Sequence, residues 1–274
     1  MRGGEKVLLS LARLYPEAPI YTLLHVKGSV APQLEARDIR TSFVQHLPAV
    51  AKRYRHYLPL FPRAAESFDL RGFDLVFSSS HCVAKGVRPA PGALHLSYCH
   101  TPMRYVWDRF DDYFGPGRVS PLARVVIRPI AARLRVWDAR SSARVHHFAA
   151  NSAYVAGRIQ RYYGRESTVI PPPVDTDFFT PGADVPGQYD LVVSALASYK
   201  RLELCLEAYR GTGRRLRIVG SGPEAARLRA SAPAEVEFLG HVGDPELREL
   251  YRACRAVLMP GIEDAGIVPL EALA

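Results

Sequence analysis

The chain has 274 residues, of which 48% are hydrophobic and 23% charged, a composition typical of a folded protein with two domains of ordinary size. No run of about 18 apolar residues is present, which excludes an ordinary membrane-spanning helix, and we expect no signal peptide because no apolar segment follows Met1–Lys6. The scattered cysteines predict buried, reduced thiols of a cytoplasmic protein rather than a disulfide framework or a metal site: Cys82, Cys99, Cys205 and Cys254.

Charge is distributed unevenly along the chain. Residues 1–170 contain 25 Lys and Arg against 12 Asp and Glu, whereas residues 171–274 contain 11 against 15. A basic first half indicates an anionic surface or substrate, and a membrane leaflet or a lipid-linked diphosphate acceptor fits better than nucleic acid because no nucleic-acid-binding motif is present. The alternative is a basic surface that serves solubility alone.

Strand-like and helix-like segments alternate through residues 1–172, which predicts a parallel α/β domain. Glu5–Leu14 and Ala153–Tyr163 have helical patterns, and Ser152 stands at an N-cap position of the second. The predicted strands are Pro19–Leu23, Phe73–Ser78, Ala93–Tyr98, His147–Ala150 and Thr168–Ile170.

Residues 186–274 repeat the alternation and predict a second α/β domain. Between the two domains, the proline run Pro171–Pro173 opens a stretch that we interpret as a stiff linker over residues 173–185. The predicted strands are Tyr189–Ala195, Leu216–Gly220, Val236–Leu239 and Ala256–Met259, and the predicted helices are Leu202–Tyr209, Pro223–Ala230 and Pro245–Ala253.

The last twelve residues follow a predicted strand and combine a turn with the start of a helix. Ligands of open α/β sheets bind beyond the carboxyl ends of strands, and the free N–H groups near Gly266, Ile267 and Val268 suit a phosphate. Glu263 precedes this helix and Glu271 lies within it, so that both carboxylates could flank one ligand.

A second string, His100–Asp108, follows the predicted strand Ala93–Tyr98. Its position puts His100 on the ligand side of the sheet, where an imidazole can bond a sugar hydroxyl or a phosphate. The next residues offer a cation, two aromatic surfaces and a carboxylate, which are groups that commonly hold sugars: Arg104, Tyr105, Trp107 and Asp108.

Two shorter motifs have phosphate-binding chemistry. Lys200 and Arg201 stand at a predicted helix start after a strand, although such a pair taken alone is more often a solvated helix end. The paired Gly3 and Gly4, between Arg2 and the helix from Glu5, would let the backbone approach a phosphate or sugar closely.

These motifs together resemble the retaining glycosyltransferases of family 4, which have the GT-B fold of two Rossmann-like domains facing a cleft. The carriers of the resemblance are GIEDAGIVPLEALA at the C-terminus, HTPMRYVWD from His100, the PPVD segment after the first domain, and the Lys200 loop. HTPMRYVWD is similar to a subgroup of mannosyltransferases of polysaccharide and lipid-linked glycan assembly.

The resemblance implies a reaction and residue roles. It implies transfer of a hexose, mannose from GDP-mannose by preference, with retention and without a metal or other cofactor. Glu263 would contact the transferred sugar, Glu271 the ribose and His100 the reaction centre, while Lys200, Arg201 and the Gly3–Gly4 loop would surround the diphosphate. An Arg that the family places five residues before the lysine is replaced by Ala195.

The resemblance also implies that the chain lacks the first strand of its first domain and part of its second. A binding fragment without activity is therefore one alternative function, and a sugar-nucleotide epimerase or hydrolase of the same fold is another.

Two basic segments, Lys52–Phe61 and Arg118–Arg144, intersperse arginines with apolar residues. Such faces can rest on anionic lipid headgroups, which would make the protein peripheral on the inner face of the cell membrane. Ordinary helices packed on the sheet are the equally weighted alternative.

Overall fold

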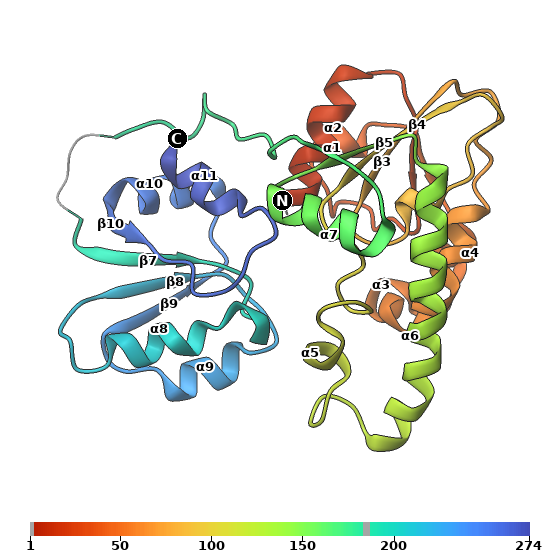
Figure 1. The fold of residues 1–274 in the computed structure, drawn as a ribbon. Coiled ribbons are helices and arrows are strands. Elements are labelled where there is room, and N and C mark those ends of the chain that lie inside the picture. The colour runs from red at the N-terminus through yellow and green to blue at the C-terminus, as the bar shows by residue number, and fades with distance from the viewer. Residues whose placement is uncertain (1–2, 183–186) are drawn as a thin grey trace. The chain divides into compact units, whose positions relative to one another are not determined.

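The computed structural model describes residues 3–182 and 187–274, and the chain divides into two compact units, Met1–Pro173 and Val174–Ala274 (Figure 1). Each unit contains a four-stranded parallel β-sheet with helices around it, which confirms the predicted α/β class. No helix among the described residues is both long enough and apolar enough to cross a bilayer.

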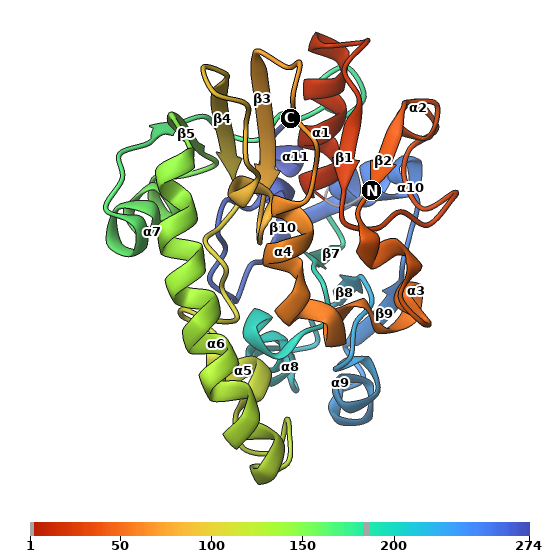
Figure 2. The same ribbon diagram turned by 90° about the vertical axis from the view of Figure 1, so that its right-hand side faces the viewer.

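The sheet of the first unit has the strand order β3-β4-β5-β6, with all neighbours parallel. Its strands are β3 (Leu75–Ser80), β4 (Leu94–Cys99), β5 (His147–Ala150) and β6 (Thr168–Val169). A separate two-stranded parallel sheet pairs β1 (Ile20–Thr22) with β2 (Ile39–Thr41), as Figure 2 shows. The sequence patterns missed β2 because three residues carry no recognisable alternation.

The helices of the first unit begin and end at local signals. The Ser120 and Ser152 hydroxyls accept N–H bonds at the starts of α6 (Pro121–Ser141) and α7 (Ala153–Tyr163), and Gly164 ends α7 in the left-handed conformation. The helices are α1 (Gly3–Leu14), α2 (Pro32–Glu35), α3 (Val50–Arg53), α4 (Phe61–Glu66), α5 (Phe110–Phe114), α6 (Pro121–Ser141) and α7 (Ala153–Tyr163). Short 3-10 turns cover Phe43–His46, Tyr54–Leu60, Ala84–Gly86 and Ser142–Arg144.

Two predictions about the first unit need correction. Gly3 and Gly4 were expected in a loop before the helix, but they form the first turn of α1, while Arg2 lies outside the described residues. The strand predicted at Phe73–Ser78 begins and ends two residues later, which brings Ser79 and Ser80 to the carboxyl edge of the sheet. That edge adjoins His100.

The sheet of the second unit has the order β10-β7-β8-β9 and is also parallel throughout. The chain runs from β7 outward to β9 and then returns to the other side of β7, so the strand order reverses between β7 and β10. The strands are β7 (Tyr189–Val193), β8 (Leu216–Val219), β9 (Val236–Gly240) and β10 (Cys254–Val257). The helices are α8 (Leu202–Tyr209), α9 (Ala225–Ser231), α10 (Asp244–Ala253) and α11 (Ile267–Leu273), with a 3-10 turn at Ser198–Lys200.

The segment after the proline run belongs structurally to the second unit. Phe179 is buried and packs edge-on against Tyr251, within a core cluster that also contains Leu191 and Leu250. Of the segment that we interpreted as a linker, Val174, Phe178 and Phe179 thus contribute to a core, and residues 183–185 lie outside the described part of the chain.

Candidate functional site

The reversal point between β7 and β10 brings together two of the predicted site residues of the second unit. In open α/β sheets, ligands bind outside the carboxyl ends of the strands at such a point. Lys200 lies in the loop that follows β7, and Glu263 lies in the loop that follows β10. The ends of two neighbouring parallel strands therefore position a cation and a carboxylate, 63 residues apart in sequence, at one edge of the sheet.

Lys200 and Glu263 form an ion pair in which the Lys200 ammonium donates to Glu263 Oε1. The lysine side chain is largely buried, and the glutamate is the more accessible of the two. Because water is partly excluded, the pair is stronger than an exposed one, and an anion that approaches Lys200 competes directly with Glu263.

Glycines allow close backbone contact between the loop after β7, which carries Lys200, and the loops after β8 and β10. A Cβ atom at Gly261 would lie 2.8 Å from Lys200 Cα, so only glycine lets the loop after β10 pass this close to Lys200. A Cβ atom at Gly220 would lie 1.9 Å from the Ser194 carbonyl oxygen, and one at Gly222 would lie 2.3 Å from that of Leu196. The Val219–Glu224 turn thus supports the loop that carries Lys200, and Gly261 is a site residue that sequence reasoning missed.

Gly266 and Glu271 shape the helix that follows Glu263. Gly266 adopts the left-handed conformation, with φ of 58°, immediately before α11. Glu271 is buried, and its Oε2 accepts a hydrogen bond of 3.2 Å from the Tyr251 hydroxyl on α10. Burial and the nearby carboxylate raise the pKa of Tyr251 well above its usual value, so Tyr251 remains a donor that fixes Glu271.

The structure does not bring Arg201 to the Lys200–Glu263 pair. Arg201 is exposed, in the left-handed conformation, and its Nε donates to Glu203 Oε1 over 2.8 Å. Ala195, at the position where the family resemblance led us to expect an arginine, is exposed in the loop after β7. Lys200 is accordingly the cation that the fold places beside Glu263.

In the first unit, His100 lies where three parallel strands end. Its ring Nε2 is 2.8 Å from the Ser79 hydroxyl at the end of β3, and its carbonyl accepts from Asn151 Nδ2 just after β5. The ring packs edge-on against Tyr98, with centroids 5.2 Å apart. Ser79 was not predicted as a site residue, because a run of three serines in a strand carries no functional signal.

The N-terminal turn of α1 lies beside His100. A Cβ atom placed on Gly4 would be 3.6 Å from His100 Nε2, which is ordinary contact distance. Gly4 and the His100 imidazole are therefore neighbours, and a side chain at position 4 would contact this ring. The structure thus places Gly4 beside His100 within the first unit, on a helix rather than on the predicted loop, and the predicted contact of Gly4 with the donor stays a prediction.

Most polar atoms of the string after His100 have partners inside the first unit. Tyr105 bonds Cys82, and burial together with that neighbour raises the pKa of Tyr105 well above its usual value. Asp108 pairs with Arg158 and accepts from Tyr162. Arg104 is half-buried in the same loop. Tyr105 and Asp108 thus have structural contacts that fasten the loop, and their predicted role toward an acceptor stays a prediction.

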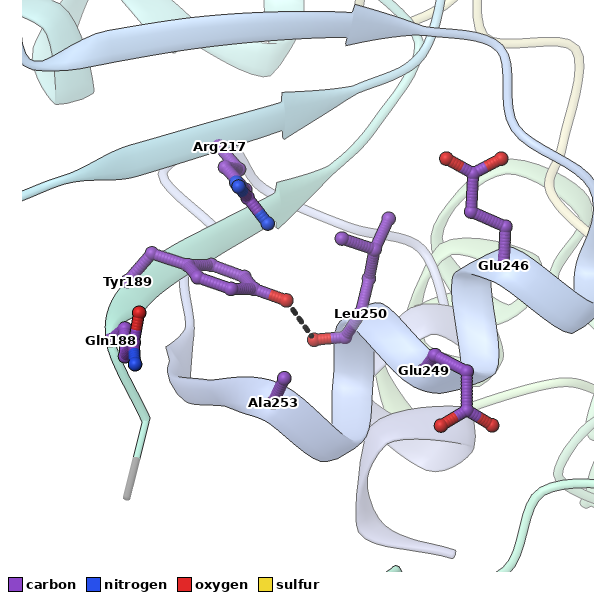
Figure 3. A pocket seen from close by; sticks show the side chains of 7 residues that line it. All are labelled: Gln188, Tyr189, Arg217, Glu246, Glu249, Leu250 and Ala253. Atoms are coloured by element: carbon purple, nitrogen blue, oxygen red, sulfur yellow. Dashed lines mark hydrogen bonds between the residues drawn. The ribbon is translucent and has the colours of Figure 1, made fainter. Parts of the chain in front are cut away.

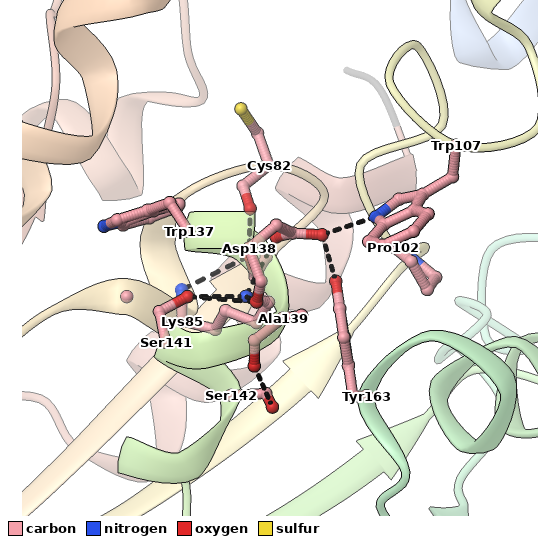
Figure 4. A network of polar contacts seen from close by, with 12 residues as sticks. Cys82, Lys85, Pro102, Trp107, Trp137, Asp138, Ala139, Ser141, Ser142 and Tyr163 are labelled. Atoms are coloured by element: carbon pink, nitrogen blue, oxygen red, sulfur yellow. Dashed lines mark hydrogen bonds and ion pairs between the residues drawn. The ribbon is translucent and has the colours of Figure 1, made fainter. Parts of the chain in front are cut away.

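Trp107 is the fourth residue of this string and reaches a buried carboxylate. Its Nε1 donates to Asp138 Oδ2 over 2.8 Å, and its ring stacks on Tyr162 at 4.6 Å. The same Asp138 oxygen accepts from the Tyr163 hydroxyl over 2.9 Å (Figure 4). Helix α6, helix α7 and the loop after β4 are therefore joined at one carboxylate.

The charge of Asp138 is balanced by Lys85, which is equally buried. Lys85 Nζ lies 2.9 Å from Asp138 Oδ1 and donates to the Ser141 hydroxyl over 2.9 Å. The ammonium also lies 4.6 Å from the centroid of the Tyr163 ring. A paired and hydrogen-bonded ion of this kind is tolerable in a core, and it fixes the geometry around the His100 loop.

The second unit also has a shallow pocket of about 410 Å³ (Figure 3). It lies at the amino ends of the strands, where Tyr189 begins β7 and bonds the Leu250 carbonyl at 3.0 Å. It contains none of the predicted site residues. Its lining consists of Gln188, Tyr189, Arg217, Glu246, Glu249, Leu250 and Ala253. Among the described residues, no three His, Cys, Asp or Glu side chains are grouped as metal ligands would be.

Two family models match the chain and meet where the two units divide. The model described as Glycosyltransferase Family 4 matches residues 1–178, and the one described as Glycosyl transferases group 1 matches residues 174–274. The chain belongs to glycosyltransferase family 4. It is therefore a glycosyltransferase, as the motifs predicted. No curated protein sequence matches it.

Solved structures similar to this glycosyltransferase include HepE, a sucrose-phosphate synthase and a galactosyltransferase. HepE of Anabaena, in complex with UDP and glucose, is 15% identical with a TM-score of 0.59, over 99% of this chain and 75% of HepE. Sucrose-phosphate synthase of Thermosynechococcus elongatus is 15% identical with a TM-score of 0.64, over 99% of this chain and 71% of the synthase. The lipopolysaccharide outer core galactosyltransferase WaaB is 16% identical with a TM-score of 0.58, over 100% of this chain and 74% of WaaB. The likeness confirms the predicted GT-B fold.

Proposed function

We propose that this glycosyltransferase transfers a hexose from a nucleotide sugar, with retention of configuration, to a lipid-linked or polysaccharide acceptor. The observation that carries the proposal is the Lys200–Glu263 pair at the reversal point of the second sheet. One cation and one carboxylate at the ligand-binding edge match the two ends of a nucleotide sugar, which are an anionic diphosphate and a hydroxyl-rich ring.

Lys200 is proposed to bind the diphosphate. Negative charge grows on the leaving nucleoside diphosphate as the glycosidic bond breaks, so a fixed cation stabilises the transition state more than the ground state. The glycine contacts around Lys200 hold its backbone in place before the donor arrives. In this proposal the lysine and the backbone N–H groups of Gly266, Ile267 and Val268 take the part that a divalent metal takes elsewhere.

Glu263 is proposed to accept hydrogen bonds from the transferred hexose, and Glu271 from the ribose. Tyr251 donates to Oε2 of Glu271 and so orients this carboxylate for the proposed contact with the ribose. His100 is proposed to act at the reaction centre, with Ser79 holding its ring. Retention would follow if the leaving phosphate assists the acceptor on the same face of the sugar.

For the donor, GDP-mannose is the candidate that the HTPMRYVWD string favours. UDP-glucose is the second candidate, because HepE, which has the same fold, was crystallised with UDP and glucose. The base is recognised mainly by backbone and shape, so these two candidates differ in contacts that the Lys200–Glu263 pair does not control.

Thermal denaturation with GDP, UDP, GDP-mannose and UDP-glucose, each in the presence of EDTA, tests the donor proposal. Selective stabilisation by one nucleotide would support a donor site that works without metal, since a ligand that binds only the folded state raises the melting temperature. Stabilisation that requires added metal, or none by any nucleotide, would contradict it.

Product analysis separates transfer from the alternative reactions. A transferase releases nucleoside diphosphate at an appreciable rate only when an acceptor is supplied, whereas an epimerase or hydrolase forms product from the donor and water alone. Product formation without acceptor would therefore contradict transfer and support the epimerase or hydrolase alternative. Donor binding without any product would favour the binding-fragment alternative.

A further inference from the structure

Helix α6 carries an apolar and basic face that is exposed along its length. Leu122, Val125 and Val126 are 77%, 68% and 56% accessible, which is unusual for three neighbouring aliphatic side chains. The exposed positions recur every three or four residues and therefore lie on one side of the helix. We define this outer face of α6 as Leu122, Val125, Val126, Pro129, Arg133, Val136 and Arg140.

The opposite side of α6 is anchored in the first unit. Ala131, Leu134 and Ser141 are buried there, and Asp138 forms the network with Lys85 and Trp107. The helix is thus rigidly attached by its inner side. The outer face is not needed for that attachment, and Figures 1 and 2 both show α6 along the outside of its unit.

The charges on α6 are almost entirely positive. The helix has five arginines and a single acid, Asp138, which is fully buried and paired. Arg124 pairs with Asp111 of α5, and Arg135 turns inward to the Val106 carbonyl. The exposed arginines that remain are Arg128 at the border of the outer face and Arg133 and Arg140 within it.

We propose that the outer face of α6 binds the surface of an anionic membrane, with the helix parallel to the bilayer. Exposed aliphatic side chains and arginines on one side of a helix suit the boundary between acyl chains and headgroups. The arginine stems can lie along the apolar layer while the guanidinium groups bond lipid phosphates. Membrane binding through α6 does not depend on the donor site, and it would place the proposed reaction at a membrane surface.

Two observations favour a lipid surface over a protein partner. The outer face has no aromatic residue, since Trp137 turns inward and bonds Glu66, whereas protein interfaces concentrate their binding energy in Trp and Tyr. A second copy of this chain would also place arginines opposite arginines across a two-fold axis, which is unfavourable.

Residues Lys52–Phe61, the other basic segment, do not extend this face. Figure 2 shows α3 well apart from α6 in the first unit. Lys52, Arg53 and Arg55 are exposed, so the segment provides a control with the same number of removable charges.

Co-sedimentation of the full chain with vesicles tests the proposal. We compare phosphatidylcholine vesicles with an equal mixture of phosphatidylcholine and phosphatidylglycerol at low and high salt. The wild type should bind the anionic vesicles about tenfold better than the neutral ones, and less at high salt. Both the Leu122→Ser/Val125→Ser/Val126→Ser and the Arg128→Gln/Arg133→Gln/Arg140→Gln variants should lose most of this binding.

The control variant Lys52→Gln/Arg53→Gln/Arg55→Gln should retain binding. Equal binding to both vesicle types, or equal loss in the control, would overturn the proposal. So would a dimer in solution that the Leu122→Ser/Val125→Ser/Val126→Ser variant dissociates, because a second copy would then occupy the face. Circular dichroism confirms that each variant is folded, and nucleotide-induced thermal shifts, which the proposal leaves unchanged, report separately on the donor site.

Discussion

Lys200 and Glu263 form an ion pair across the point where the strand order of the second sheet reverses. In the proposed reaction each residue binds a different part of the donor, so the donor must separate them. Before the donor binds, the ion pair keeps both side chains neutralised and oriented. When the donor binds, its diphosphate takes the place of Glu263 at Lys200, and its sugar takes the place of Lys200 at Glu263.

Glu263→Gln should separate the two roles. Turnover should fall by about 100-fold or more, because the amide is a weaker acceptor for the hexose hydroxyls. Binding of the nucleoside diphosphate alone should strengthen by a few-fold, because Lys200 no longer has a carboxylate partner. Initial rates and calorimetric titration measure the two effects.

Glu203→Gln is the matched control for this experiment. It removes the exposed carboxylate that pairs with Arg201, so neither rate nor affinity should change much. Weaker diphosphate binding in Glu263→Gln would contradict competition for Lys200, and unchanged turnover would remove Glu263 from the reaction.

His100→Ala should lower the turnover number by about 100-fold, in the range of a lost positioned side chain at a reaction centre. Ser79→Ala should have a smaller effect, about tenfold, since it removes one hydrogen-bond partner of the ring and leaves the imidazole in place. His147→Ala, an exposed histidine at the start of β5, is the control that should leave the rate unchanged. Equal rates for His100→Ala and His147→Ala would contradict the assignment.

Gly220→Ala should destabilise the second unit. The residue has φ of 135°, and the new methyl group would meet the Ser194 carbonyl oxygen at 1.9 Å. Strain and backbone displacement together should cost about 2 kcal/mol or more of unfolding free energy. Gly243→Ala, where the nearest atom is 3.7 Å away, should be near neutral in the same urea titration. Equal stability of the two variants would show that the turn relaxes freely.

Lys85→Met should destabilise the first unit by about 3–5 kcal/mol, because it leaves the buried Asp138 carboxylate without its counter-charge. Arg71→Met, which breaks the solvent-exposed pair with Asp69, should change stability little. Chemical denaturation of both variants makes the comparison. A loss in Lys85→Met no larger than in Arg71→Met would mean that the network does not hold the unit together.

His95 predicts a pH dependence of stability. Burial lowers its pKa from 6.5 to about 4, and its Nδ1–H donates to the Arg144 carbonyl while Nε2 accepts from Ser78. Between these pH values the unfolded chain binds a proton that the folded unit does not, so stability falls as the pH drops from 6.5 to 4. The full effect is about 3 kcal/mol. Denaturation at several pH values should show a shallower slope in His95→Asn, and an unchanged slope would contradict the prediction.

Much of the fold follows from local sequence patterns. The bounds of β5, α7 and α8 agree with the predictions at both ends, because each has a clear period and a turn or cap beside it. The α/β class follows from the same alternation. Gly3 and Gly4 were misplaced because glycine has a low helix propensity, and here the first turn of α1 tolerates it.

The site was only partly predictable. Motif positions placed Lys200, Glu263 and His100 at strand ends, and the family resemblance assigned Lys200 and Glu263 to one donor. Their direct ion pair was not predicted, because it depends on β10 returning to β7. Asp138 among the arginines of α6 gave no sign of burial, since helical spacing does not say which face meets the core. Gly261 was missed because close backbone approach is a tertiary property.

Calorimetric titration of GDP and UDP, in EDTA, into the wild type and Lys200→Ala tests the central claim most directly. The account predicts that one nucleotide binds the wild type and that Lys200→Ala weakens this binding at least about tenfold, as expected for loss of a charge-assisted contact. Equal affinity in the two proteins, or no binding of either nucleotide to the wild type, would contradict a donor site at the Lys200–Glu263 pair.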